Sequence, residues 1–127
     1  MIPVMQTKFG NNEGNCFTAS LASILEVKLE DVPEMSHLTD GTWFPVCNKF
    51  LFERGYKFHG TLYNIDEILA YNGIDGYYIV GGGSPRGCPR GHAVVFYKGK
   101  MIHDPHPDGR GITNIDFAYM IEPAELK

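Results

Sequence analysis

A β-hairpin is the feature that most restricts what this chain can fold into. Residues 92–97 form a run rich in β-branched and aromatic residues, residues 100–104 form a second short strand-like run, and only a tight Lys-Gly turn separates them. A turn of this length joins two antiparallel strands. The start of the first strand then faces the end of the second, so we expect His92 and Asp104 to lie close together.

The remaining apolar pattern predicts helices in the first half of the chain and further strands in the second. Phe17, Leu21 and Ile24 recur at the spacing of one helical face, which predicts a helix over residues 16–27. Helices followed by strands describe an α+β fold, and the length of 127 residues suits a single domain spanning 1–127. The other expected elements are helices at 42–54 and 64–71, a helical turn at 29–34, and strands at the N-terminus, 56–62, 76–80 and 115–121.

Charge and hydropathy argue against several classes of function. The net charge is −4 and the eleven basic residues are scattered, whereas proteins that bind nucleic acid or anionic membranes carry a basic patch. No apolar run approaches the ~18 residues that a membrane helix needs, and the N-terminus lacks the pattern of a signal peptide. Three cysteines without a CxxC pair suit a reducing compartment. We therefore expect a cytoplasmic protein that binds neither nucleic acid nor membranes.

Cys16 lies where a polar loop turns into the first helix. Asn15 is a favourable N-cap residue, and Gly14 leaves room for the chain to bend just before it. In the first turn of a helix, unpaired N–H groups and the helix dipole favour a thiolate, which predicts a lowered pKa for the Cys16 thiol. The alternative is that Cys16 is a small apolar residue of the core.

The predicted hairpin supplies the groups that a thiol nucleophile needs. Such a nucleophile requires a base, usually a histidine, and a third group that fixes the tautomer of that histidine. His92 and Asp104 are of the right types and are expected to be adjacent. The side-chain amide of Gln6 could stabilise an oxyanion together with the Cys16 backbone N–H. The asparagines at positions 11, 12 and 15 are alternative donors.

These motifs occur in an order that is similar to that of a known superfamily. They are Gln6, then Gly14-Asn15-Cys16 with Ala19, then Gly91-His92-Ala93-Val94-Val95, and finally Asp104-Pro105. The set resembles the papain-like cysteine hydrolases, above all the C39-like peptidases and their small free-standing relatives in bacteria and phages. The resemblance implies Cys16 as nucleophile, His92 as general base and acid, and Asp104 as the orienting residue. It also implies Gln6 as oxyanion donor.

The implied protein is a cysteine peptidase or amidohydrolase. Its fold would pack N-terminal helices, with the nucleophile at a helix N-terminus, on a C-terminal antiparallel sheet. Its substrate would be a peptide or protein, its reaction hydrolysis or acyl transfer at an amide bond, and it would need no cofactor. A non-catalytic papain-like module that binds a peptide or partner protein is the alternative. The residues expected to contact substrate are Asn15, Trp43, Gly91 and His106.

Other motifs carry weaker predictions. Residues 103–108 include two histidines and two aspartates, but their spacing does not project a metal-binding set, so no metal is expected. The glycine-rich segment 81–91 is followed by no helix and therefore does not fit a phosphate loop. Cys47 is expected in the core and Cys88 in an exposed loop. Arg86 could face an acidic substrate group or simply be solvated.

Overall fold

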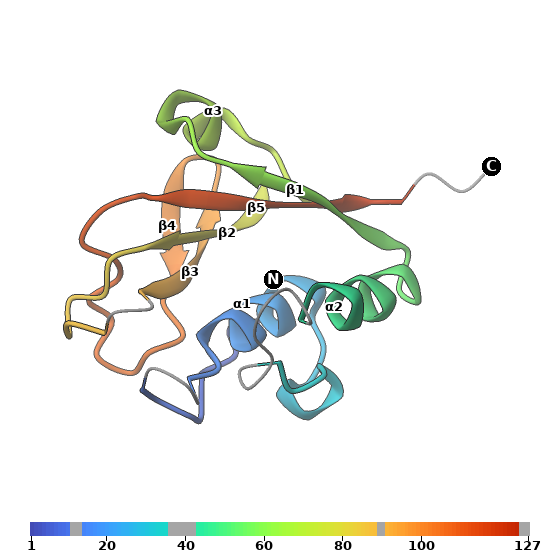
Figure 1. Cartoon of the computed structure of the whole chain (residues 1–127), viewed down its shortest axis with the longest axis horizontal. Coiled ribbons are helices and arrows are strands. Elements are labelled where there is room, and N and C mark those ends of the chain that lie inside the picture. Colours follow the sequence, from blue (N-terminus) through green and yellow to red (C-terminus); the bar gives the residue numbers. More distant parts are fainter. Residues whose placement is uncertain (11–13, 36–42, 89–90, 125–127) are drawn as a thin grey trace.

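A five-stranded antiparallel sheet is the centre of the fold, and helices cover both of its faces. The computed structural model describes residues 1–10, 14–35, 43–88 and 91–124. The strands follow the order β1-β5-β2-β3-β4 across the sheet. In Figure 1, α1 and α2 lie on one side of the sheet and α3 at its opposite side. The strands are β1 (Tyr56–Leu62), β2 (Tyr77–Gly82), β3 (His92–Tyr97), β4 (Lys100–His103) and β5 (Phe117–Pro123), and the helices are α1 (Cys16–Leu25), η1 (Leu29–Asp31), α2 (Trp43–Phe52) and α3 (Ile65–Ala70).

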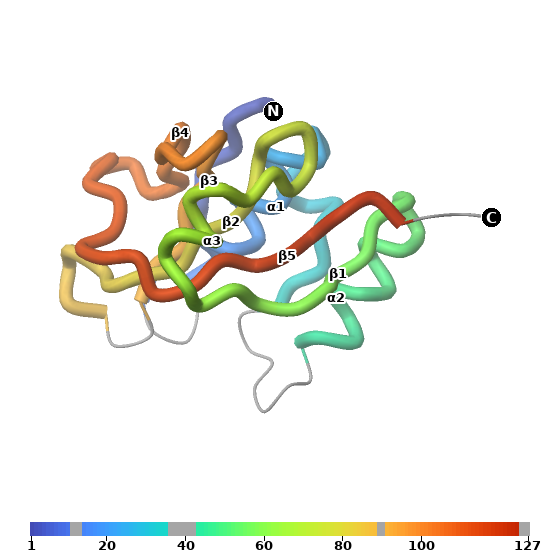
Figure 2. Tube along the Cα trace, turned by 90° about the horizontal axis from the view of Figure 1, so that it is seen from above, coloured from blue at the N-terminus to red at the C-terminus, as the bar shows by residue number. Residues whose placement is uncertain are grey.

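The alternation of side chains along the central strands builds two apolar layers. Ile79 pairs with Val95 and Val80 pairs with Val94 in the β2–β3 register, so each pair points to one face of the sheet. The first pair packs with α1 and α2, and the second packs with Ile68 of α3. Figure 2 shows α1 beneath β2 and β3, and α2 beneath β1. The buried apolar faces thus hold α1, whose first residue is Cys16, against the strand that begins with His92.

Most of the predicted elements are confirmed. β1 and β3 have the predicted bounds, the predicted first helix ends two residues early at Leu25, and β2 and β5 are each shifted by one or two residues. The mixed α+β class is confirmed as well. Thr42, expected to cap the second helix, lies outside the described residues. No helix within the described ranges is both long and apolar enough to cross a bilayer.

The strand predicted at the N-terminus is wrong. Residues 1–9 form no regular element and instead run along α1 as an extended segment. The backbone N–H of Ile2 and of Val4 donates to Ser23 of α1 at 3.0 and 2.9 Å. Further on, the Gln6 N–H donates to the Pro105 carbonyl at 2.9 Å. The backbone polar groups of this segment form hydrogen bonds with α1 and with Pro105. This path brings Gln6 towards the start of β3.

Gly82 provides a stability test of the wall of the site. It ends β2, and a Cβ at this position would stand 1.8 Å from the Asn114 carbonyl oxygen, a backbone atom that no side-chain rotation can move. We therefore expect Gly82→Ala to lower the free energy of unfolding by about 1–3 kcal/mol, the usual cost of overpacking. Chemical denaturation measures the change. An unaltered midpoint would show that the 113–117 segment is not packed on β2 as described.

Candidate active site

Cys16 and His92 line the same cleft where α1 packs on β3. The backbone N–H of Ala93, the residue after His92, acts on the Cys16 thiol and favours a lower pKa of that thiol. Cys16 and His92 line two adjoining cavities, one of about 370 Å³ and one of about 330 Å³. The sequence separates these residues by most of the chain, and the packing of α1 on the sheet brings them to one cleft.

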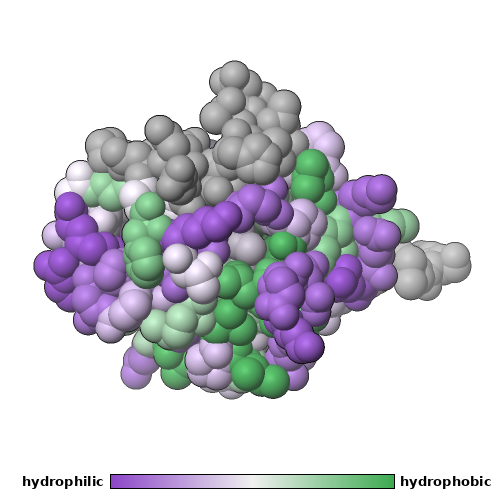
Figure 3. Space-filling view, turned by 90° about the horizontal axis from the view of Figure 1, so that it is seen from below, coloured by the Kyte–Doolittle hydropathy of each residue, from purple (hydrophilic) through white to green (hydrophobic). Residues whose placement is uncertain are grey.

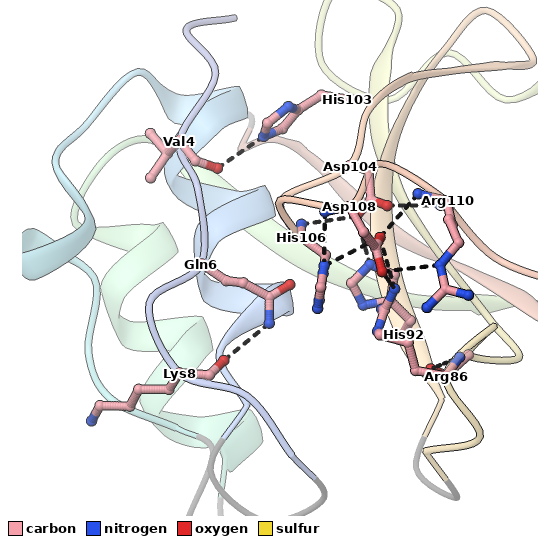
Figure 4. Close-up of polar contacts among 12 residues, drawn as sticks. Val4, Gln6, Lys8, Arg86, His92, His103, Asp104, His106, Asp108 and Arg110 are labelled. Carbon is pink, nitrogen blue, oxygen red and sulfur yellow. Dashed lines mark hydrogen bonds and ion pairs between the residues drawn. The ribbon is translucent and has the colours of Figure 1, made fainter.

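A buried carboxylate holds the His92 ring. The Nε2 atom of His92 lies 2.6 Å from Asp104 Oδ1, and each side chain is 3% exposed. The same carboxylate accepts the His106 N–H at 2.9 Å on Oδ1 and the Gly111 N–H at 2.7 Å on Oδ2. Figure 4 shows the cluster of side chains around this pair. Because Nε2 is hydrogen-bonded to Asp104, Nδ1 is the ring nitrogen that remains to accept a proton.

The pair is adjacent for a different reason than strand register. In the ladder His92 pairs with Gly82 of β2, and His103 at the end of β4 pairs with Val95. Asp104 follows β4 and starts the turn over residues 104–111, whose N–H groups hold its carboxylate. The predicted proximity is therefore confirmed, while the predicted cross-strand pairing is wrong.

Burial and hydrogen bonds set the charge states of the pair. Burial lowers the pKa of His92 below its ordinary value, and this outweighs the opposing effect of Asp104. Asp104 is itself partly desolvated, but its bonds to His92, His106 and Gly111 hold its carboxyl pKa below the usual range. At neutral pH the imidazole is therefore neutral and Asp104 is ionised. With Nε2–H donating to Asp104, Nδ1 carries the lone pair of a base.

The expected lowered pKa of Cys16 is wrong. Burial raises the pKa of the thiol, although the N–H groups of Ala93, Phe17 and Cys16 itself act in the opposite direction. Burial costs the thiolate more hydration free energy than the hydrogen bonds at the helix start provide. At neutral pH Cys16 is accordingly a thiol that needs a neighbouring base to become a nucleophile.

Gln6 reaches the same cleft from the N-terminal segment. It is buried, lines the 330 Å³ cavity together with Cys16 and His92, and donates from Nε2 to the Lys8 carbonyl at 3.0 Å. Its Oε1 is buried and has no hydrogen-bond partner among the described residues. Figure 4 shows its amide pointing from the N-terminal segment towards His106. Nε2 carries a second hydrogen that the bond to Lys8 does not use.

Asn15 does not contact the cleft as expected. Its Oδ1 accepts the N–H groups of Thr7 and Lys8 at 3.0 Å each, and its Nδ2 donates to Thr7 Oγ1 at 3.1 Å. Asn15 does occupy the N-cap position, yet its side chain makes no bond to the helix. The buried amide instead fixes the loop between Gln6 and the helix. Its predicted side-chain cap is therefore wrong, and Asn15 is not among the described residues that line either cavity. Asn11 and Asn12 lie outside the described residues.

The other expected contact residues line the cleft. Trp43 borders the larger cavity, His106 the smaller one, and Gly91 both. Cys88 also lines both cavities, so the expectation of an incidental exposed thiol is wrong. Cys47 is fully buried, as predicted.

Sequence reasoning missed the aromatic wall of the larger cavity. Phe17 packs edge-to-face on Trp43 at 5.7 Å and on Tyr119 at 4.9 Å, and Phe117 packs on Tyr119 at 5.1 Å. All four rings line this cavity. The signal available in the sequence was the alternation in β5, which places Phe117 and Tyr119 on one face of the strand.

Neither similarity to known proteins nor a cluster of metal ligands adds to the geometry of the cleft. No protein-family model matches the chain, and no curated protein or solved structure matches it either. Within the described ranges, no three His, Cys, Asp or Glu side chains gather as a metal site requires. The function has to be inferred from the cleft itself.

Proposed function

We propose that the protein is a cysteine-dependent hydrolase or acyl transferase with a papain-like fold, acting on an amide or peptide bond. One observation carries the proposal: the buried His92–Asp104 pair opens on the cleft that Cys16 also lines. A neutral imidazole, held by a carboxylate and set beside a thiol, is the arrangement that activates a sulfur nucleophile.

The reaction begins with a proton transfer. His92 takes the proton of the Cys16 thiol on Nδ1 while its Nε2–H stays on Asp104, which stabilises the imidazolium. The sulfur attacks the substrate carbonyl and forms a tetrahedral oxyanion. His92 then gives its proton to the leaving amine, and a thioester remains on Cys16. Water or another acceptor, activated by His92, releases the acyl group and restores the thiol.

Two N–H groups are placed to stabilise the oxyanion. The backbone N–H of Cys16 is one of the unpaired donors of the first turn of α1. The Gln6 amide is the second, because it lines the same cavity and is held from behind by the Lys8 carbonyl. Donors fixed in advance cost no reorganisation when the charge develops.

The proposed substrates are peptides or proteins, and the proposed location is the cytoplasm. A nucleophilic thiol has to stay reduced, which favours a reducing compartment. None of the steps above calls for a cofactor.

An activated ester tests the proposal without knowledge of the natural substrate. With p-nitrophenyl acetate, Cys16 should displace p-nitrophenolate, gain an acetyl group seen by intact-mass spectrometry, and lose it again to water as acetate. Cys16→Ser should show neither the burst of p-nitrophenolate nor the mass increase. Acetylation spread evenly over all three cysteines of the parent protein would contradict the proposal.

The pH dependence of this acetylation follows from His92. Its neutral form is the base, and burial holds its pKa below 6.5, so the rate should stay high down to pH 6.5 and fall only below it. Stopped-flow rates between pH 4.5 and 9 measure this profile. A rate that climbs steadily to pH 9 without a plateau would indicate an unassisted thiol.

A non-catalytic binding module is the second candidate. The observation in its favour is the raised pKa of Cys16, which keeps the sulfur protonated unless His92 acts on it. This candidate predicts either no acetyl-Cys16 or slow acetylation whose rate climbs to pH 9 without a plateau, so the two measurements above decide between the candidates.

A further inference from the structure

The smaller cavity carries hydrogen-bond donors from four separate segments. Gln6, Ser84, Arg86 and His106 line it together with Cys16 and His92. No aspartate or glutamate is among the described residues that line this cavity. Figure 3 shows hydrophilic residues gathered at the left end of the molecule, where Figure 1 places the loops after β2 and β4. A pocket lined by hydrogen-bond donors and by no described carboxylate fits an anionic group.

Arg86 contributes a positive charge that its partner does not cancel. Asp108 accepts two bonds from Arg86 Nη1, at 3.0 and 2.8 Å, and one from Arg110 Nε at 3.1 Å. One carboxylate is shared by two guanidinium groups, which leaves this cluster with one net positive charge. Because both bonds to Asp108 use Nη1, that pair does not engage Nη2 and Nε of Arg86. This positive charge also acts on the candidate active site, because Arg86 helps to lower the pKa of His92.

Two further donors are oriented by their neighbours. The Nδ1 atom of His106 lies 3.1 Å from the Asp108 backbone nitrogen and 3.2 Å from Asp108 Oδ1, so Nε2 is the ring nitrogen that Asp108 does not engage. Ser84 Oγ accepts the Arg86 N–H at 3.2 Å, which leaves its hydroxyl proton to donate. The His106 ring stands edge-on to His92 at 6.2 Å between centroids. These donors therefore lie beside the catalytic pair of the proposed function.

We propose that this cavity binds a carboxylate of the substrate next to the bond that Cys16 attacks. The inference rests on the proposed function and names its substrate class: peptides or amides with a carboxylate adjacent to the reacting carbonyl. A carboxylate accepts several hydrogen bonds in one plane, which matches a guanidinium with a flanking imidazole and hydroxyl. The cavity volume of about 330 Å³ suits a small group.

The lining of the larger cavity explains why the substrate carboxylate would bind in the smaller cavity instead. Four aromatic rings line it, and Asp116 is its one carboxylate among the described residues. An anionic group would meet apolar rings and a like charge there, both of which oppose its binding. The cleft thus directs the carboxylate to the Arg86 side and an apolar or aromatic part of the substrate to the Trp43 side.

Two alkylating reagents test the pocket directly. Iodoacetate and iodoacetamide both form an S–CH₂ bond and release iodide, and they differ in whether a carboxylate or an amide follows the CH₂ group. An ordinary thiolate repels the anionic reagent and reacts faster with the amide. At pH 7 we expect Cys16 to react at least about tenfold faster with iodoacetate, with saturation kinetics that acetate slows.

Arg86→Met and Arg110→Met form a matched pair for this test. Each removes one guanidinium from Asp108, but of the two side chains only Arg86 lines the cavity. Arg86→Met should abolish the preference for iodoacetate, measured as the ratio of the two alkylation rates within one variant, and Arg110→Met should keep that ratio. Faster reaction of the parent protein with iodoacetamide, or equal loss in both variants, would overturn the inference.

Binding of succinate to Cys16→Ser separates this inference from the proposed function. We expect saturable shifts of the His106 ring protons in NMR spectra, retained after Arg110→Met and lost after Arg86→Met. Unreactive Cys16 with intact succinate binding would reject the catalytic function and keep the carboxylate pocket. Reactive Cys16 without succinate binding would reject the pocket alone.

Discussion

Replacing His92 with alanine should slow the alkylation of Cys16 by iodoacetamide at pH 6 by about a hundredfold, the lower end of what a positioned base contributes. Burial raises the pKa of this thiol, so at pH 6 it is protonated and reacts only if a neighbour accepts its proton. Because burial lowers the pKa of His92, a larger fraction of this imidazole is neutral at that pH than of an exposed histidine. Peptide mapping with isotopically labelled reagent gives the rate for each cysteine.

His59→Ala is the matched control for this experiment. His59 is an exposed residue of β1, a strand at the far edge of the sheet from β4. Its removal should leave Cys16 labelling unchanged, while Cys47 and Cys88 report labelling that does not depend on His92. Slow and equal modification of all three thiols in the parent protein would leave no support for a catalytic cleft.

The sequence was sufficient to predict the parts of the site that depend on local pattern. The hairpin follows from alternating β-formers around a tight turn, and it correctly predicts that His92 and Asp104 are close, although the turn after β4 and not the strand register positions the carboxylate. The position of Cys16 at a helix start follows from apolar spacing and is confirmed. These features involve residues within one element or two adjacent ones.

The remaining features depend on what packs over each residue. A helix start predicts a lowered thiol pKa, but the burial of Cys16 between α1 and β3 reverses the sign. The side chain of Asn15 was expected to cap the helix, yet it binds Thr7 and Lys8, and no pattern in the sequence predicts that this segment lies beside Asn15. Long-range contacts of this kind leave no periodic signal in the chain.

The turn over residues 104–111 connects several of these contacts. Its N–H groups hold the Asp104 carboxylate, and the Pro105 carbonyl accepts the Gln6 N–H at 2.9 Å. Asp108 in the same turn bonds to Arg86 across from it. One short segment thus positions the orienting carboxylate, the candidate oxyanion donor and the guanidinium of the proposed carboxylate pocket. A change at Asp104 should therefore affect both stability and reactivity.

Asp104→Asn should lower the rate of Cys16 acetylation by about 10²- to 10⁴-fold, because the carboxylate fixes the tautomer of the base and stabilises the imidazolium. An asparagine cannot replace the carboxylate, because it offers an acceptor oxygen at only one of the two oxygen positions. If the amide oxygen accepts from His92 and His106, the NH₂ group faces the Gly111 N–H, and two donors then meet in a buried position. If the amide is turned, the NH₂ group faces His92 and favours the tautomer with the proton on Nδ1.

Either orientation leaves a buried donor unpaired, so the variant should also lose about 1–3 kcal/mol of unfolding free energy. Asp66→Asn, an exposed substitution in the first turn of α3, is the control and should change neither quantity beyond about 0.5 kcal/mol or a twofold rate. Denaturant titration and the p-nitrophenolate burst give the two readouts. Loss of stability with full acetylation would mean that Asp104 supports the turn without orienting His92, and the triad would then lack its third member.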